Sequence, residues 1–284
     1  MREGSVKCLS SEGFHRMAYV EWGDAANPRV LVCVHGLTRC GRDFDFLAQA
    51  LENDYRVVCP DVAGRGRSDR LRNKALYALP QYCADMTTLV ARLNVATVDW
   101  LGTSMGGLIG MALAAQPGNP IRKLILNDVG PVITAASLAR IGNYLGKPPR
   151  FDDIAQAEAY VRQVSAPFGP LTDAQWRHLT VHVVHQAADG KIEFLYDPGI
   201  AEAYRAAQQA DAGKDILLWP LYDAITCPTL LLRGAHSDLL TAEAAQAMHQ
   251  RGPRAQLVEI PGVGHAPMLM DAAQVAPVRE FLLQ

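Results

Sequence analysis

The sequence predicts a doubly wound α/β fold, in which a mostly parallel β-sheet carries helices on both faces. Short β-rich runs alternate with helix-like segments along most of the chain, as βαβ units require. The runs at 30–34 and 124–126 are apolar without alternation, which is typical of strands buried on both faces. With 284 residues, 49% of them hydrophobic, the chain is long enough to bury a sizeable core.

The expected elements follow one another in a regular order. β-rich runs lie at 17–23, 29–36, 55–62, 96–102, 123–129, 228–234 and 255–262. Helix-like segments lie between or after them at 42–52, 80–93, 105–115, 241–250 and 271–283. Each helix that links two such strands is a crossover of the kind that joins parallel neighbours.

The alternation breaks in the second half of the chain. Between about 131 and 223 the sequence has several helical segments and turn signals but no strong buried strand, and the strand pattern resumes at Pro228. We therefore expect an α/β core formed by 1–130 and 224–284, interrupted by a helical cap at 131–223.

Composition excludes several function classes. Lys and Arg number 27 against 29 Asp and Glu, so the charge balance argues against a nucleic-acid surface. No apolar run approaches the roughly 20 residues that a membrane-spanning helix needs, and the first residues lack the apolar middle of a secretory signal. The six cysteines include no C-x-x-C pair, and a reduced, cytoplasmic protein is predicted. Oligomeric state is not predicted.

The hexapeptide "GTSMGG" at 102–107 is the most informative stretch. A strand that ends near Gly102 and a helix that begins near Met105 leave room only for a sharp turn, with small neighbours around Ser104. This is the pattern of the G-x-S-x-G nucleophile elbow. A dinucleotide fingerprint requires glycine where Ser104 stands, and a P-loop requires a lysine that is absent. The alternative to a nucleophile elbow is that the glycines only allow close packing and that Ser104 has no catalytic role.

A serine nucleophile needs a base, and the base needs an orienting carboxylate. Asp238 follows the run at 228–234, and His265 lies in a glycine-rich loop after the run at 255–262. The order Ser104, Asp238, His265 is that of the α/β-hydrolase arrangement. Asp128 also ends a strand and is the rival acid; if Asp238 has the role, Asp128 is a structural or pocket-edge carboxylate.

Five segments in this order resemble the α/β-hydrolase superfamily from end to end. They are "VCVHGLT", "CPDVAGRGRSD", "GTSMGG", "LLRGAHSDLL" and "PGVGHAP". One departure is that the family often has Gly-His-Gly where this chain has Gly64-Arg65-Gly66. That loop is not catalytic in the family, so the change bears on local packing or pocket polarity.

The resemblance implies an oxyanion hole formed by the backbone N–H groups of Leu37 and Met105, with His35 shaping the first of these loops. It implies no cofactor and no metal. His178, His182 and His185 fall at i, i+4 and i+7, a spacing that metal sites use, but we expect them to form a polar face of a cap helix.

The expected function is hydrolysis of small carboxylic esters through an acyl-enzyme. A serine at the elbow argues against the relatives whose nucleophile is a carboxylate. The same motifs and cap leave open an enol-lactonase or a carbon–carbon bond hydrolase of aromatic catabolism. A non-turnover ligand-binding member of the fold is the alternative from a different class. The expected partner is a small ester or related carbonyl compound.

Overall fold

An eight-stranded sheet forms the centre of the molecule. The computed structural model describes residues 1–210 and 213–284. The sheet has the order β1-β2-β4-β3-β5-β6-β11-β12. Its strands are β1 (Arg2–Ser10), β2 (Gly13–Trp22), β3 (Val30–Val34), β4 (Arg56–Pro60), β5 (Val98–Thr103), β6 (Ile121–Asn127), β11 (Thr229–Gly234) and β12 (Gln256–Ile260).

All strand pairs from β4 to β12 are parallel, and only β1 and β2 run antiparallel to their neighbours. The predicted mostly parallel sheet is therefore confirmed. The sequence patterns missed β1, a half-exposed edge strand in which only Val6 and Cys8 are buried. A strand with so few buried side chains lacks the apolar run that marks the central strands.

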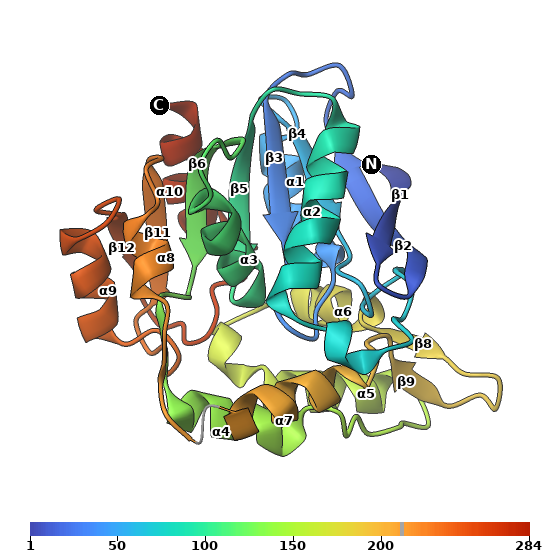
Figure 1. Ribbon diagram of the computed structural model, residues 1–284. Coiled ribbons are helices and arrows are strands. Elements are labelled where there is room, and N and C mark those ends of the chain that lie inside the picture. The colour runs from blue at the N-terminus through green and yellow to red at the C-terminus, as the bar shows by residue number, and fades with distance from the viewer. Residues whose placement is uncertain (211–212) are drawn as a thin grey trace.

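Helices cover both faces of the sheet (Figure 1). Side chains of α1 (Asp45–Leu51) and α10 (Ala272–Leu283) belong to one buried apolar cluster, and those of α2, α3, α8 and α9 to another. The latter helices span Leu79–Leu93, Met105–Ala114, Trp219–Asp223 and Ala242–Gln250. The two clusters lie on opposite sides of the strands, which explains why the central strands are buried on both faces.

The helices between 135 and 210, within the segment predicted to be a cap, form a separate layer at the carboxyl ends of the parallel strands (Figure 1). The last helix of that predicted segment, α8, packs in the core cluster instead. The chain leaves the core through β7 (Val132–Ile133) and returns through β10 (Ile216–Leu217), which pair with each other. Between them lie α4 (Ala135–Tyr144), α5 (Ile154–Val164), α6 (Asp173–Val181), β8 (Val184–Gln186), β9 (Ile192–Phe194) and α7 (Ile200–Ala210). Short 3₁₀ turns occur at 41–44, 74–76 and 166–168.

None of the helices in the described part of the chain combines the length and the apolar character needed to cross a bilayer.

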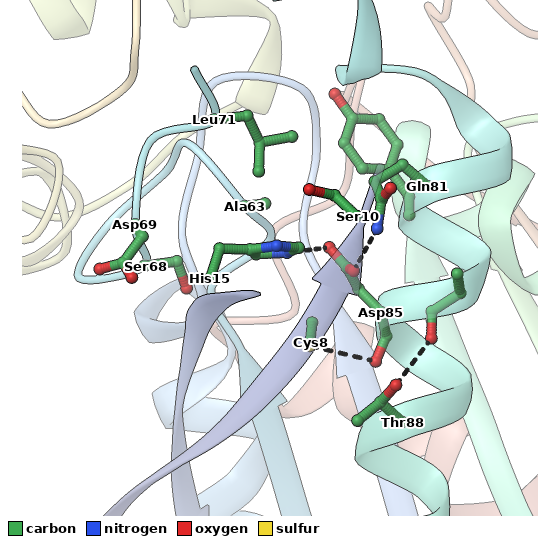
Figure 2. Close-up of polar contacts among 12 residues, drawn as sticks. Cys8, Ser10, His15, Ala63, Ser68, Asp69, Leu71, Gln81, Asp85 and Thr88 are labelled. Atoms are coloured by element: carbon green, nitrogen blue, oxygen red, sulfur yellow. Dashed lines mark hydrogen bonds and ion pairs between the residues drawn. The ribbon is translucent and has the colours of Figure 1, made fainter. Parts of the chain in front are cut away.

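A buried polar cluster ties the amino-terminal hairpin to α2 (Figure 2). The His15 Nε2 atom on β2 lies 2.9 Å from Asp85 Oδ2 on α2, and both side chains are buried. Asp85 Oδ1 also accepts a hydrogen bond from Gln81 at 2.7 Å, and the Cys8 thiol donates to the Asp85 backbone carbonyl. Because a buried polar group is costly without its hydrogen-bond partner, this pair should fix the hairpin against the helix.

Asp85→Ala should lower the free energy of unfolding by roughly 2 kcal/mol, because it leaves the buried His15 imidazole without its hydrogen-bond partner. Urea denaturation followed by circular dichroism measures the change. Thr87→Ala is the matched control on the same helix, since Thr87 is exposed. Equal, small losses in the two variants would contradict the role given to the His15–Asp85 pair.

Candidate active site

Ser104 occupies a strained turn between β5 and α3. Its backbone has φ 52° and ψ −115°, a conformation that L-residues rarely adopt. The Ser104 N–H donates to the Asn127 carbonyl at 3.0 Å, which fixes the turn to the end of β6. The side chain is half-buried and points away from the strand ladder toward His265.

The glycines around Ser104 allow β5, α3 and β3 to approach closely. A Cβ on Gly102 would lie 2.2 Å from the backbone of Gly106, and a Cβ on Gly106 would lie 2.0 Å from the Val34 carbonyl oxygen. Neither atom is a flexible side-chain end, so no larger residue fits without moving the backbone. The sharp bend therefore requires these glycines.

Three side chains form a hydrogen-bonded chain at the carboxyl ends of the strands. Ser104 Oγ lies 3.0 Å from His265 Nε2, and His265 Nδ1 lies 2.7 Å from Asp128 Oδ2. Asp128 is fully buried, whereas the His265 side chain is 19% exposed. A hydroxyl, an imidazole and a buried carboxylate in this order form the geometry of a nucleophile, its base and the group that orients the base.

The structure contradicts the predicted position of Asp238. Asp238 is exposed, and its carboxylate lies 2.9 Å from the Arg140 guanidinium on α4. The residue in contact with His265 is Asp128, the rival carboxylate. The reason is strand order, because β6 lies directly beside β5 with Asn127 paired to Thr103. Asp128, the first residue after β6, therefore lies close to Ser104, the first residue after β5.

Sequence analysis missed Ser237, which holds the Asp128 carboxylate in place. Ser237 Oγ donates to Asp128 Oδ2 at 2.6 Å, while the Gly234 N–H donates to Asp128 Oδ1 at 2.8 Å. Both donors come from the end of β11, the loop in which the acid was expected. The "AHSD" segment thus contributes to the site through its serine and not through Asp238.

The N–H groups of Leu37 and Met105 are free to face a ligand. Neither donates to an acceptor among residues 1–210 and 213–284. Met105 follows Ser104 at the start of α3, and an ideal Cβ on Gly36 would lie 3.8 Å from Ser104 Cβ. Both predicted donors therefore lie on segments that flank Ser104.

His35 is bound to backbone groups on both sides of its ring. Its Nε2 atom accepts from the Val62 N–H at 2.9 Å, so its Nδ1–H donates to the Gly36 carbonyl at 2.7 Å. Burial lowers the His35 pKa to about 3, with the positive charges of Arg65 and Arg39 acting in the same direction. A neutral imidazole thus connects the loop that carries Leu37 to the end of β4.

Within residues 1–210 and 213–284, two groups of side chains have ligand types that bind metals. Asp45, His178 and His182 converge, but the Arg42 guanidinium already pairs with the Asp45 carboxylate. His185 lies apart on β8, because α6 ends at Val181, so the expected helix face of three histidines does not form.

Cys8, His15 and Asp85 form the second group. Burial and the Asp85 charge raise the Cys8 pKa to about 12, which favours the thiol over the thiolate that binds metals.

The similarities to known proteins extend over nearly the whole chain. A model described as the Alpha/beta hydrolase family matches residues 31–278. The chain is 54% identical over 284 residues to 3-hydroxybutyrate-oligomer hydrolase of Cupriavidus necator, which covers 99% of this chain and 97% of that protein. It is 26% identical over 243 residues to Esterase YbfF of Escherichia coli, covering 84% of this chain and 87% of that protein. A crystal structure of an alpha/beta hydrolase from Novosphingobium aromaticivorans matches with TM-score 0.85 and 35% identity, over 99% of this chain and 98% of that one.

The depressed pKa of His35 predicts a specific loss of stability in acid. Between pH 6.5 and about 3 the unfolded chain binds a proton at His35 that the folded chain does not, so stability falls as the pH falls. His35→Asn should make the pH dependence of the free energy of unfolding shallower by about 1.4 kcal/mol per pH unit in this window. Urea denaturation at a series of pH values measures it. His236→Asn, at an exposed imidazole, should keep the wild-type slope; identical slopes in all three proteins would refute the prediction.

Proposed function

Because the chain belongs to the α/β-hydrolase family and is an enzyme that acts on ester bonds, we propose that it is a serine hydrolase that cleaves small carboxylic esters through an acyl-enzyme. The observation that carries the proposal is the hydrogen-bonded chain from Ser104 through His265 to Asp128. The Ser104 hydroxyl contacts the imidazole that would deprotonate it, and that imidazole contacts the carboxylate that would orient it.

In the proposed reaction, His265 Nε2 accepts the Ser104 hydroxyl proton as Ser104 Oγ attacks the ester carbonyl carbon. The tetrahedral intermediate then collapses, and the imidazolium of His265 protonates the departing alkoxide. Water, deprotonated by His265, attacks the acyl-enzyme in the same manner and releases the acid. Asp128 holds the imidazole in one tautomer and stabilises its cationic form.

The carbonyl oxygen becomes negative in each tetrahedral intermediate. We assign the N–H groups of Leu37 and Met105 as its donors, because both lie beside Ser104 without another acceptor in the described part of the chain. Removing one such donor typically costs 10²- to 10³-fold in rate. Since both donors are backbone groups, side-chain substitutions at these positions change the shape of the site and not the donation.

We further propose short linear oligomers of 3-hydroxybutyrate as the substrate class. The support is the 54% identity to 3-hydroxybutyrate-oligomer hydrolase over nearly the whole of both chains. Such oligomers are polyesters, in which the hydroxyl of one unit is esterified by the carboxyl of the next. The reaction proposed for Ser104 applies to this bond without change.

Residues 131–223 are proposed to act as a cap that selects the substrate. Of its helices, α4, α5, α6 and α7 form a layer at the carboxyl ends of the strands (Figure 1). Ser104, Asp128 and His265 follow strands at that same edge. All six cysteines are free thiols, which agrees with the predicted cytoplasmic location. That location stays a prediction.

The test of the proposed function is hydrolysis by the wild type and by Ser104→Ala. The panel contains 3-hydroxybutyrate dimer and trimer, p-nitrophenyl esters of graded chain length, an enol-lactone and a vinylogous diketone. We expect cleavage of the oligomers and short esters, and a loss of at least about 10³-fold in the variant. Preference for the lactone or the diketone would reject the ester assignment, and equal rates in the two proteins would reject the serine mechanism.

Asp128→Asn should lower kcat by about 10³- to 10⁴-fold, because the amide cannot stabilise the imidazolium and favours the wrong tautomer. Asp238→Asn is the matched control and should change kcat less than threefold, since the exposed Asp238 carboxylate pairs with Arg140 at the surface. Steady-state kinetics on a short p-nitrophenyl ester measures both. The opposite ranking of the two variants would restore Asp238 as the acid.

A further inference from the structure

Arg65 is a completely buried arginine that has no carboxylate partner in the described part of the chain. Its exposed fraction is 0%, and it forms no ion pair with any residue in the two described ranges, 1–210 and 213–284. The Asp61 carboxylate, four residues earlier, accepts from the backbone N–H groups of Gly41 and Arg67. A buried charge without a counterion is costly, so its retention needs a physical reason.

Neutral groups hold the guanidinium of Arg65 in one position. It donates to the Leu37 carbonyl from Nε at 2.8 Å and to the Ala63 carbonyl from Nη1 at 2.8 Å. Nη1 also donates to the Tyr82 hydroxyl at 2.9 Å, and the rings of Tyr77 and Tyr82 lie 5.6 and 5.1 Å from the guanidinium carbon. Carbonyl dipoles and aromatic faces stabilise the cation but leave its charge uncancelled.

The contacts of Arg65 converge on Leu37 and Met105, the two residues proposed as oxyanion donors. Besides the Leu37 carbonyl, the guanidinium contacts the Met105 sulfur, with Nη2 at 3.5 Å from Sδ. One side chain thus connects the loop after β3 to the first residue of α3. Arg39, which lies on the loop after β3 itself, is paired with Asp43 through two hydrogen bonds, so its charge is compensated.

We propose that Arg65 is a positioning residue for the oxyanion site, which holds Leu37 and Met105 in place and supplies an uncompensated positive charge to the intermediate. The inference rests on the proposed function, because it assumes that a negative charge develops beside these two residues. The neutral ester gains little from a buried cation, whereas the tetrahedral oxyanion is attracted to it in a low-dielectric environment. Arg65 should therefore act on kcat more than on KM.

The test compares Arg65→Met and Arg65→Lys in steady-state kinetics on a short p-nitrophenyl ester. Arg65→Met should lower kcat by roughly 10- to 100-fold, less than the loss of a direct donor, and leave KM within threefold. Arg65→Lys, which keeps the charge but not the planar fork, should recover part of the loss. Arg67→Met is the matched control on the same loop, because Arg67 is partly exposed and pairs with Glu3 at the surface. It should stay within twofold of the wild type.

A second measurement separates electrostatics from packing. A trifluoromethyl ketone that forms an anionic adduct with a catalytic serine should bind Arg65→Met more weakly by the same factor as kcat falls. A neutral ester analogue should bind equally to both proteins. An unchanged kcat in Arg65→Met, or equal losses for the ketone and the neutral analogue, would overturn the proposal.

If Arg65→Met does not fold by circular dichroism, Arg65→His replaces it. Histidine is the residue that the resembled family often carries at this position, and it is uncharged at pH 8. The same loss of kcat is expected, and a wild-type kcat would overturn the proposal.

Ser104→Ala distinguishes failure of the proposed function from failure of the role proposed for Arg65. Activity in Ser104→Ala refutes the proposed function itself, whereas an inactive Ser104→Ala with a fully active Arg65→Met refutes only the role of Arg65.

Discussion

The candidate site depends on one constraint, the sharp reversal of the chain between β5 and α3. The Ser104 backbone can hold its strained conformation only because the surrounding packing determines it. Gly102 and Gly106 allow backbone to meet backbone where any Cβ would collide. The same packing places the N–H of Met105 at a helix start, where no preceding turn can accept it. The position of the hydroxyl and that of one proposed oxyanion donor are thus consequences of a single bend.

The parallel sheet then brings distant parts of the sequence to this bend. Strands β5, β6, β11 and β12 are neighbours, and their carboxyl ends lie at one edge of the sheet. Asp128 leaves β6, Ser237 follows β11 and His265 follows β12, so residues more than 100 positions apart meet within hydrogen-bond distance. Ligands of open α/β sheets bind outside this edge for the same topological reason.

A buried positive charge lies beside Leu37 and Met105. Arg65 is buried without a carboxylate partner among residues 1–210 and 213–284, and the neighbouring His35 is kept neutral by burial and by that positive charge. The positive charge of Arg65 opposes protonation of His35, and in the proposed reaction it would favour a negative charge at the substrate oxygen. The stability cost of burying Arg65 and the proposed catalytic benefit thus have the same origin.

The sequence by itself determined the fold class, the elbow and the histidine, because each depends on local patterns. Apolar runs predicted the central strands, the glycines around Ser104 predicted the bend, and the loop order predicted the contact with His265. Strand order was not available from these patterns, since neighbours in the sheet need not be neighbours in the chain. Only the tertiary structure therefore decided that Asp128, and not Asp238, lies against His265, and that Ser237 supports it. The same holds for Arg65, which sequence analysis noted as a departure and which three-dimensional packing places against Leu37 and Met105.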